Sequence, residues 1–302
     1  MGEVANGNAT ARRRSLAGIG LAAVALAWAA GALAAEPPQA GGVGKPSRIV
    51  SLDLCTDQLL VELVDRARIA AVTHLAADST VSAIPEKARG IPITRGAAED
   101  VLRYDPDLIL AGPFGVSASV DLLRRLGRRV VVVPLPQDLA GVRTAVRTVA
   151  TTAGAEREGE ALIADFDRRL ARLAAFRSEP RPTAVIYQVG GTVSGPGSLA
   201  DAALAAAGYR NMASDYRLTR GGQAPLEVLL ADPPDLLVLS SGAEEYRTAL
   251  ADNLRHPALR LLRRRQASIE LPWRHWLCGT PHVVEAVERL AEARARIGAR
   301  GR

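Results

Sequence analysis

A short stretch near the end of the chain gathers side chains suited to a large planar or anionic ligand. Trp273 and Trp276 flank Arg274 and His275. Indole rings stack on planar molecules, and a guanidinium group donates charge-assisted hydrogen bonds to anionic oxygens. Aromatic residues make up only 4% of the chain, so this is its one concentrated aromatic and cationic cluster. We expect at least one of the two tryptophans to touch a ligand, and the alternative is that one ring packs in the core.

Two glutamates share a pattern that recurs in the two halves of the chain. Glu99 stands seven residues before Pro106, and Glu227 stands seven residues before Pro234. In both places the proline is followed by aspartate and an apolar run, which predicts a short helix and then a buried strand. On its own, a glutamate near a helix start is a partner of the helix dipole on a solvated face. The repeat indicates that the two halves are related.

Signatures of catalysis and of metal binding are absent from the sequence. The glycine-rich stretch 190–198 lacks the lysine and Ser/Thr of a phosphate loop and does not fit G-x-G-x-x-G. No G-x-S-x-G and no C-x-x-C occurs, and the four histidines lack the i, i+4 spacing of a helical zinc site. We therefore expect no enzyme, no resident metal and no cofactor. Stretch 190–198 is expected to line a ligand cleft or to form a simple turn.

The elements that position these residues alternate between short β-branched runs and longer amphipathic stretches, a pattern typical of α/β layers. Expected strands cover residues 48–52, 69–72, 108–111, 130–133, 184–189, 236–240 and 269–271. Expected helices cover residues 57–64, 120–126, 199–207, 227–231, 257–265 and 281–297. Between the halves, residues 139–176 are predicted to be helical with an interruption at Gly154. The predicted fold is α/β, with two halves joined by a long helix.

The first residues have the composition of an export signal. Three arginines at 12–14 precede an apolar run over 16–35 that ends in Ala-Leu-Ala-Ala. A membrane anchor is the alternative, because about 20 apolar residues just span a bilayer. We expect a signal peptide over 1–35 that is cleaved between about residues 33 and 37, which places the mature chain in the periplasm. The pattern leaves the choice between Sec and twin-arginine export open.

The overall composition is that of an ordinary globular protein. Hydrophobic residues make up 48% and charged residues 23% of the chain, which excludes extended disorder and a multi-span membrane protein. The formal charge of +6, from 38 basic and 32 acidic residues, is too mild to indicate a nucleic-acid partner. A chain of this length accommodates one or two domains.

Together these features resemble the helical-backbone (class III) periplasmic substrate-binding proteins of ABC importers, the group that carries cobalamin, ferric siderophores and haem. The resemblance covers nearly all of residues 47–302. It rests on the 48–52 run with its following helix, the two Glu-x6-Pro-Asp segments, the long central helix and the Trp-x-Cys-Gly-x-Pro stretch at 276–281.

The resemblance implies two α/β lobes joined by a single long backbone helix, with the ligand cleft between the lobes. The expected parts are a flexible leader over 36–46, an N-terminal lobe over 47–140, linking helices over 141–178 and a C-terminal lobe over 179–302. In such proteins a glutamate on each lobe meets arginines of the membrane permease, and Glu99 and Glu227 match those positions. The expected partners are a chelated-metal small molecule and an ABC permease dimer, and the protein itself is expected to be a monomer.

The resemblance also places the ligand-binding residues, on loops at the strand ends of both lobes. They are Asp53, Cys55, Thr56, His74, Arg95, Phe114, Tyr187, Tyr216, Arg220, Trp273, Arg274, Trp276 and Cys278. Tyr187 and Tyr216 are equally compatible with the core. Cys55 and Cys278 are expected on opposite lobes, and a disulfide needs Cα atoms within about 7 Å, which a cleft wide enough for a corrinoid would not normally permit. Free thiols facing the ligand are therefore favoured over a bridge.

The predicted function is capture of a chelated-metal nutrient in the periplasm and its delivery to a permease. A ferric siderophore comes first and cobalamin a close second, because nothing in the sequence separates them. One alternative is a haem or metal-ion carrier with direct ligation by His74, His275 or His282. Another is an enzyme on a similar two-lobe frame, as in metal-cluster assembly, against which the missing C-x-x-C and the export signal both argue.

Overall fold

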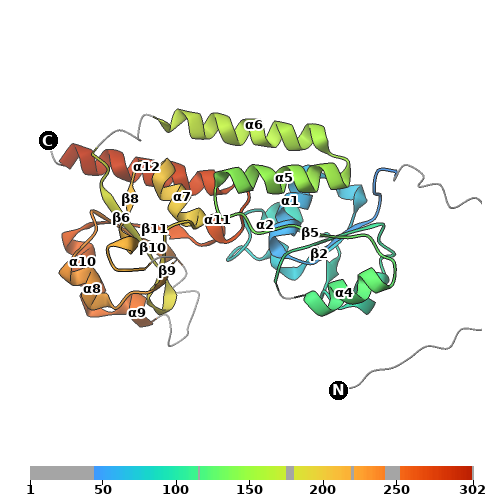
Figure 1. Ribbon diagram of the computed structural model, residues 1–302, viewed down its shortest axis with the longest axis horizontal. Helices are drawn as coiled ribbons and strands as arrows, with labels where there is room; N and C mark the ends of the chain where they lie inside the picture. The colour runs from blue at the N-terminus through green and yellow to red at the C-terminus, as the bar shows by residue number, and fades with distance from the viewer. Residues whose placement is uncertain (1–43, 115, 175–179, 219–220, 242–251, 301–302) are drawn as a thin grey trace, which may run out of the picture. The chain divides into compact units, whose positions relative to one another are not determined.

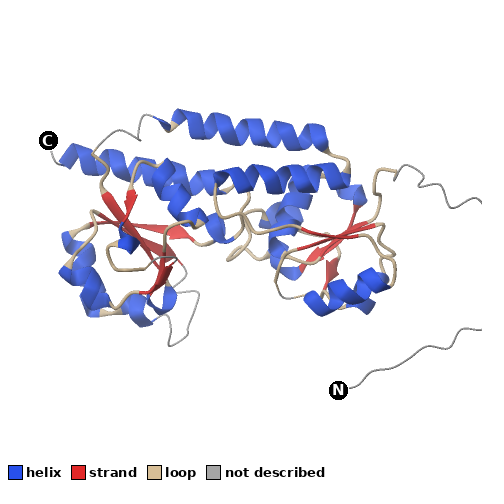
Figure 2. Ribbon diagram, in the orientation of Figure 1, coloured by secondary structure: helices blue, strands red, loops and turns tan. Residues whose placement is uncertain are grey.

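The first lobe is built on a parallel sheet whose strands come from residues 49–132 (Figures 1 and 2). The computed structural model describes residues 44–114, 116–174, 180–218, 221–241 and 252–300. The predicted signal peptide, most of the leader and Arg220 lie outside the described residues. Among the residues that the structure describes, no helix is both long and apolar enough to cross a bilayer.

The five strands of this sheet run in the order β3-β2-β1-β4-β5. They are β1 (Ile49–Ser51), β2 (Ile69–Thr73), β3 (Ile93–Thr94), β4 (Leu108–Ala111) and β5 (Val130–Val132). In the parallel register, Ile49 lies between Ile69 of β2 and Leu108 of β4. Strands β1 and β4 are buried throughout, as expected for a parallel sheet covered on both faces. The order reverses between β1 and β4, which makes that edge the topological switch point of the sheet.

Helices cover both faces of the first sheet. They are α1 (Leu54–Leu63), α2 (Pro85–Ala88), α3 (Ala98–Leu102) and α4 (Ser117–Arg125), with the short 3₁₀ turns η1 (Arg66–Arg68) and η2 (His74–Ala77). One core contains apolar residues of α1 together with strand residues such as Ile49. The core on the other face contains residues of α3 and α4, among them Val101 and Leu123.

Two helices, α5 (Leu139–Ala153) and α6 (Glu156–Arg172), carry the chain from the first lobe to the second. Gly154 ends α5 in the left-handed conformation with φ of 63°, so the predicted interruption is confirmed. On α6, Ile163 packs in the first-lobe core, whereas Phe166 and Leu170 pack in the second-lobe core. The helix α6 therefore spans both cores, and α5 lies against it (Figure 1).

The second lobe contains a six-stranded mixed sheet in the order β11-β10-β6-β7-β9, with β8 paired to β6. Its strands are β6 (Thr183–Tyr187), β7 (Thr192–Ser194), β8 (Arg210–Asn211), β9 (Gly221–Gln223), β10 (Leu236–Ser241) and β11 (Ala267–Pro272). Strands β6, β10 and β11 are parallel, and β7 is antiparallel to β6 and β9. Both lobes belong to one compact unit, and the predicted α/β class with two lobes is confirmed.

Helices also cover both faces of the second sheet. They are η4 (Val189–Gly191), α7 (Leu199–Ala206), η5 (Met212–Ser214), α8 (Leu226–Ala231), α9 (Asp252–Arg255), α10 (Pro257–Arg265), α11 (Arg274–Leu277) and α12 (Val283–Arg300). One core joins α7 and α12 to α6, and the other contains residues of α8, α9 and α10. Arg169 of α6 donates to both carboxylate oxygens of Glu288 on α12, at 2.8 and 2.6 Å, so α12 is also held to α6 by charge.

Candidate ligand cleft

The first turn of α1 stands at the switch point of the first sheet, directly after β1. Asp53 caps the helix, because its Oδ1 accepts from the backbone N–H groups of Cys55 at 2.9 Å and Thr56 at 3.4 Å. This cap starts the helix at Leu54, three residues before the predicted start at 57. Burial raises the pKa of Asp53 although both backbone hydrogen bonds lower it. Ligands of open α/β sheets bind at this edge, so the capped turn is a candidate site.

Gly112 directly follows β4, and its lack of a side chain lets the end of β4 approach the first turn of α1. A Cβ atom at Gly112 would lie 2.5 Å from Cγ of Asp53, closer than any real contact. The two strand ends on either side of the switch point therefore meet at the Asp53 carboxylate. Any side chain at residue 112 would displace the carboxylate or the loop.

A cavity of about 370 Å³, here called the first cavity, opens at this edge of the sheet. Loops after β1, β4 and β5 form its walls, and residues 277 and 279 of the second lobe complete it. Phe114 is 70% exposed, so a large ring stands in solvent on its wall. The lining residues are Asp53, Leu54, Cys55, Thr56, Leu59, Leu75, Pro113, Phe114, Val133, Pro134, Leu135, Pro136, Ala145, Leu277 and Gly279.

A second cavity of about 230 Å³ adjoins the first. The two share Leu135, Pro136 and Leu277, and the second cavity continues along the second lobe. Its other lining residues are Gln137, Gln188, Ser194, Ser198, Leu199, Ala200, Trp273 and Trp276. Apolar walls with uncharged hydrogen-bonding groups thus extend from one lobe to the other.

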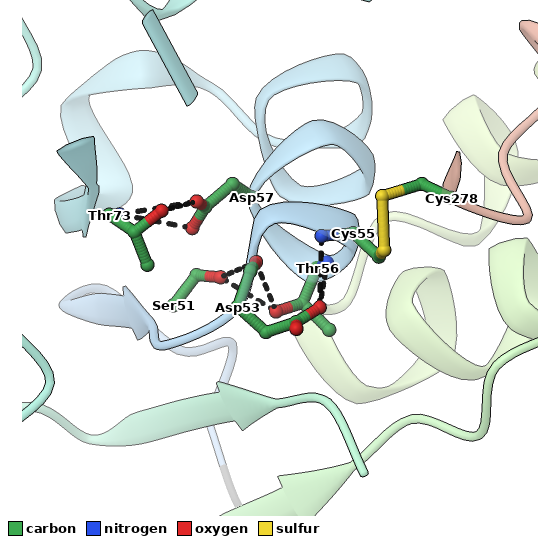
Figure 3. The surroundings of a disulfide bond; sticks show 7 residues. All are labelled: Ser51, Asp53, Cys55, Thr56, Asp57, Thr73 and Cys278. Carbon is green, nitrogen blue, oxygen red and sulfur yellow. Dashed lines mark hydrogen bonds between the residues drawn. A yellow bond between two sulfur atoms is a disulfide. The ribbon is translucent and has the colours of Figure 1, made fainter. Parts of the chain in front are cut away.

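A disulfide joins Cys55 to Cys278 across the two lobes (Figure 3). Their Cα atoms lie 5.0 Å apart, so the expectation of free thiols is wrong. The physical reason is that the lobes touch at this end of the cleft, whereas the expectation assumed a gap as wide as the ligand. A Cβ atom at Gly279 would lie 2.4 Å from Cβ of Pro136, which shows how closely the two lobes approach. Neither sulfur is available as a thiolate ligand.

Several residues predicted to bind a ligand do line these cavities. Asp53, Cys55, Thr56 and Phe114 line the first cavity, and the two tryptophans line the second. Thr56 is buried, and its Oγ1 donates to the backbone carbonyl of Asp53 at 3.0 Å (Figure 3). It supports the turn that carries the carboxylate.

The two tryptophans differ in burial. Trp276 is only 8% exposed and belongs to the second-lobe core, as the core alternative predicted for one ring. Trp273 is half-buried and packs against the same core. Trp273 therefore has the more accessible ring for a ligand.

Other predicted ligand residues lie outside the lining of both cavities. Arg274 instead donates from Nη1 to the carbonyl oxygen of Ser79 at 3.1 Å, which bridges the lobes. Tyr216 donates to the carbonyl oxygen of Asp232 at 2.7 Å, and Tyr187 is buried in the second-lobe core. The remaining predicted ligand residues outside both cavities are His74 and Arg95, which are exposed, and Cys278, which is buried.

The histidines form no metal site in the described residues. Nδ1 of His282 lies 3.0 Å from Glu285, and Nδ1 of His275 lies 3.2 Å from the same carboxylate. His74 is exposed on η2. Within the ranges that the structure describes, no group of three or more His, Cys, Asp or Glu side chains is placed to hold a metal ion.

The apolar wall of the first cavity escaped the sequence analysis. Its main missed segment is Val133–Pro136, which follows β5, and Leu75 on another side was missed as well. Two prolines directly after a predicted strand were the available signal, because a rigid loop at a carboxyl strand end is where such sheets bind ligands. Ser194 and Ser198 line the second cavity, in agreement with the expectation that stretch 190–198 lines a cleft, and Gln188 lies just before that stretch.

Glu99 and Glu227 occupy equivalent places on the two lobes. Each lies in the first turn of a short helix, α3 or α8, and each is exposed. The predicted position near a helix start is confirmed for both. Neither residue lines the first or the second cavity.

Comparison with known proteins gives consistent matches. The family described as "Periplasmic binding protein" matches residues 49–263. A curated "Cobalamin-binding protein" of Halobacterium salinarum is 28% identical over 205 residues, which are 66% of this chain and 55% of that protein. The chain thus spans about half the length of the curated relatives that it matches.

Solved structures share the fold. The apo haem-binding protein RhuT of Roseiflexus sp. RS-1 superposes with a TM-score of 0.69 at 24% identity, over 83% of this chain and 98% of that one. The vitamin B12 binding protein BtuF of Vibrio cholerae gives 0.65 at 18% identity, over 84% and 98%. At these identities the likeness shows the architecture of two α/β lobes.

Proposed function

The chain belongs to the periplasmic binding protein family, and we propose that it is the non-enzymatic substrate-binding component of an ABC importer. In this proposal it captures a chelated-metal nutrient in the periplasm and delivers it to a membrane permease. The observation that carries the proposal is the first cavity, which lies at the switch point of the first sheet and is completed by Leu277 and Gly279 of the second lobe.

The lining of the two cavities favours a metal that arrives with its own chelator. Among the described lining residues, Asp53 is the one ionisable side chain, and no histidine, methionine or tyrosine is present. Apolar walls and the Trp273 ring suit the organic periphery of a chelate. Gln137, Gln188 and the two serines of the second cavity suit amide groups on that periphery.

Of the two chelate classes, we place cobalamin first and a ferric hydroxamate second, which reverses the order that the sequence suggested. The reason is the curated relative, a cobalamin-binding protein. Direct ligation of haem or of a metal ion by histidine finds no support, because His74, His275 and His282 all lie outside both cavities.

We test the ligand with the chain from residue 36 onward, whose tryptophans are Trp273 and Trp276. Cyanocobalamin, haemin and a ferric hydroxamate are titrated while tryptophan fluorescence is recorded. We expect quenching by cyanocobalamin, and we expect Phe114→Ala to weaken binding by about tenfold or more through lost apolar contact. Leu126→Ala is the matched control, because Leu126 is 53% exposed and lies outside both cavities. Equal binding by the two variants would remove the first cavity from the proposal, and no binding of any of the three chelates would refute the proposal.

Docking to the permease is proposed to use the exposed carboxylates of Glu99 and Glu227. Both residues lie outside the two cavities, so the permease could contact both lobes through them without touching the ligand. We expect Glu99→Arg and Glu227→Arg to retain ligand affinity and to abolish uptake by cells, because charge reversal replaces attraction by repulsion. Glu86→Arg on α2, a side chain that is 72% exposed, is the control that should leave uptake unchanged. Loss of ligand affinity in the first two variants would contradict the docking role.

A further inference from the structure

We propose that the Cys55–Cys278 disulfide sets the width of the ligand cleft and so determines which chelates the protein holds. This inference rests on the proposed function. Cys55 is the second residue of α1 in the first lobe and lines the first cavity. Cys278 follows α11 in the second lobe, between Leu277 and Gly279, which line that cavity as well. The bond therefore crosses the boundary between the lobes at the wall of the candidate site.

The disulfide adds a second covalent connection to the one made by the linking helices. The chain passes from the first sheet to the second once, through α5 and α6, so a single connection would leave the far side of the lobes free to separate. The bond closes a loop between residues 223 positions apart in sequence. With both connections present, opening at the Cys55 end of the cleft requires bond cleavage.

Two weaker contacts join the lobes near the same place. The Nη1 atom of Arg274 donates to the carbonyl oxygen of Ser79, and Nε2 of His282 lies 3.3 Å from Oε1 of Glu62. Polar contacts of this kind are weak, and they break and re-form readily. A disulfide persists in an oxidising compartment, so of these three ties it alone holds the lobes permanently.

The bond also places apolar wall residues where the two cavities meet. Leu277 and Gly279, on either side of Cys278, face the loop that contains Leu135 and Pro136. A wall held in place before the ligand arrives spares the ligand the free energy of ordering it. A rigid wall also rejects chelates that would need the lobes to separate at this end.

Single substitutions at the two cysteines separate the bond from the local contact of one sulfur. Cys278→Ala removes the bond and leaves Cys55 on the cavity wall, whereas Cys55→Ala removes both the bond and that wall atom. The double variant excludes effects of an unpaired thiol. We measure cyanocobalamin binding to each, together with amide hydrogen exchange of the ligand-free proteins over residues 133–137 and 277–282.

We expect Cys278→Ala and Cys55→Ala to weaken cyanocobalamin binding equally, by about tenfold if one molecule in ten remains in the binding-competent arrangement. Exchange over 277–282 should accelerate in both ligand-free variants. The ratio of the affinities for cyanocobalamin and for the smaller ferric hydroxamate should differ between these variants and the wild type. Unchanged affinity in Cys278→Ala would overturn the proposal, even if Cys55→Ala binds weakly.

Reduction of the wild-type protein provides a test without any substitution. A trialkylphosphine converts the disulfide to two thiols and takes up one oxygen atom from water as the phosphine oxide. Hydrogen exchange over 277–282 then reports whether the lobes separate in the absence of a ligand. This experiment therefore tests the role of the disulfide even if no chelate binds and the proposed function fails. Exchange that stays slow after complete reduction would show that the lobes are held without the bond.

Discussion

Replacing His282 by glutamine is expected to abolish a loss of stability that the wild-type protein shows between pH 6.5 and 9. The His282 ring lies between two carboxylates, with Nε2 at 3.3 Å from Glu62 on α1 and Nδ1 at 3.0 Å from Glu285 on α12. Lys87 of α2 lies 2.8 Å from Glu62, and His275 lies 3.2 Å from Glu285. Protonation of His282 thus ties the first lobe to the second.

The size of the effect follows from the pKa of His282 in the folded protein. Burial alone lowers this pKa, but hydrogen bonds and the negative charges of Glu285 and Glu62 outweigh burial and raise the pKa to about 9. The side chain is 22% exposed, so solvent screening is limited. A rise from the ordinary value of 6.5 corresponds to about 3 kcal/mol, at roughly 1.4 kcal/mol for each pKa unit.

The direction with pH follows from proton binding. Between pH 6.5 and 9 the folded protein keeps the His282 proton that the unfolded chain has lost, so the free energy of unfolding falls as pH rises. The contribution is fully present below pH 6.5 and lost above 9. The pKa values of Glu62 and Glu285 are lowered, mainly by the neighbouring histidines, so their contribution is lost only as pH falls below their ordinary value of 4.5.

Urea unfolding at pH 6, 7, 8 and 9 measures the effect. His282 should contribute a loss of up to about 3 kcal/mol over this range in the wild type. His282→Gln should be less stable at pH 6 and should keep only the smaller fall near pH 7 that Asp57 contributes. His74→Gln serves as the matched control, because His74 is exposed and should leave the wild-type slope intact. Parallel curves for the wild type and His282→Gln would refute the reasoning.

Other variants test the packing and the buried groups. Gly159→Ala should lower the free energy of unfolding in urea by about 1 to 2 kcal/mol, because the new Cβ atom would lie 2.5 Å from Cβ of Ala150. This clash outweighs the higher helix propensity of alanine. Adding Ala150→Gly should restore most of the lost stability. Trp276→Ala should cost about 3 to 5 kcal/mol of stability and should weaken cyanocobalamin binding less than Trp273→Ala does, because the Trp276 ring is mostly buried in the core. Trp273→Ala should chiefly weaken cyanocobalamin binding, and the opposite assignment would contradict the burial of the two rings. Burial raises the pKa of Asp57 to about 7, so between pH 4 and 7 the folded protein keeps a proton that the unfolded chain has lost, and the free energy of unfolding falls as pH rises. Asp57→Asn should flatten this fall, and an unchanged slope in urea unfolding would contradict the prediction.

The strands that could be predicted are those with a continuous apolar pattern. In the predicted runs 108–111 and 236–240, residues 108–111 and 236–239 are buried, so the apolar composition alone identifies these strands. Strands β3, β7, β8 and β9 have only two or three residues, and β9 begins with Gly221 and Gly222. Their pairing depends on neighbours distant in sequence, which no local preference encodes.

The candidate site was predictable where a polar or aromatic residue directly follows a predicted strand, as Asp53 does. The disulfide was not, because its partners are 223 residues apart and nothing local reports how closely the lobes approach. For the same reason the sequence did not indicate that Arg274, predicted to contact a ligand, donates to Ser79 on the opposite lobe. Contacts between lobes are tertiary facts that composition and spacing do not contain.

The first turn of α1 couples the candidate cavity to the rest of the first lobe. Asp53 faces the cavity, Cys55 carries the disulfide, and Thr56 shares a hydrogen bond of 2.8 Å with Ser51 at the end of β1 (Figure 3). One turn further, the buried carboxylate of Asp57 accepts hydrogen bonds from Thr73 of β2. Strands β1 and β2 pair in the sheet, so these hydrogen bonds connect the cavity wall and the disulfide to the centre of the first lobe. Variants in this turn therefore alter the turn and the anchor of the disulfide together, whereas Cys278→Ala removes the bond from the opposite lobe and leaves the hydrogen bonds of the turn in place.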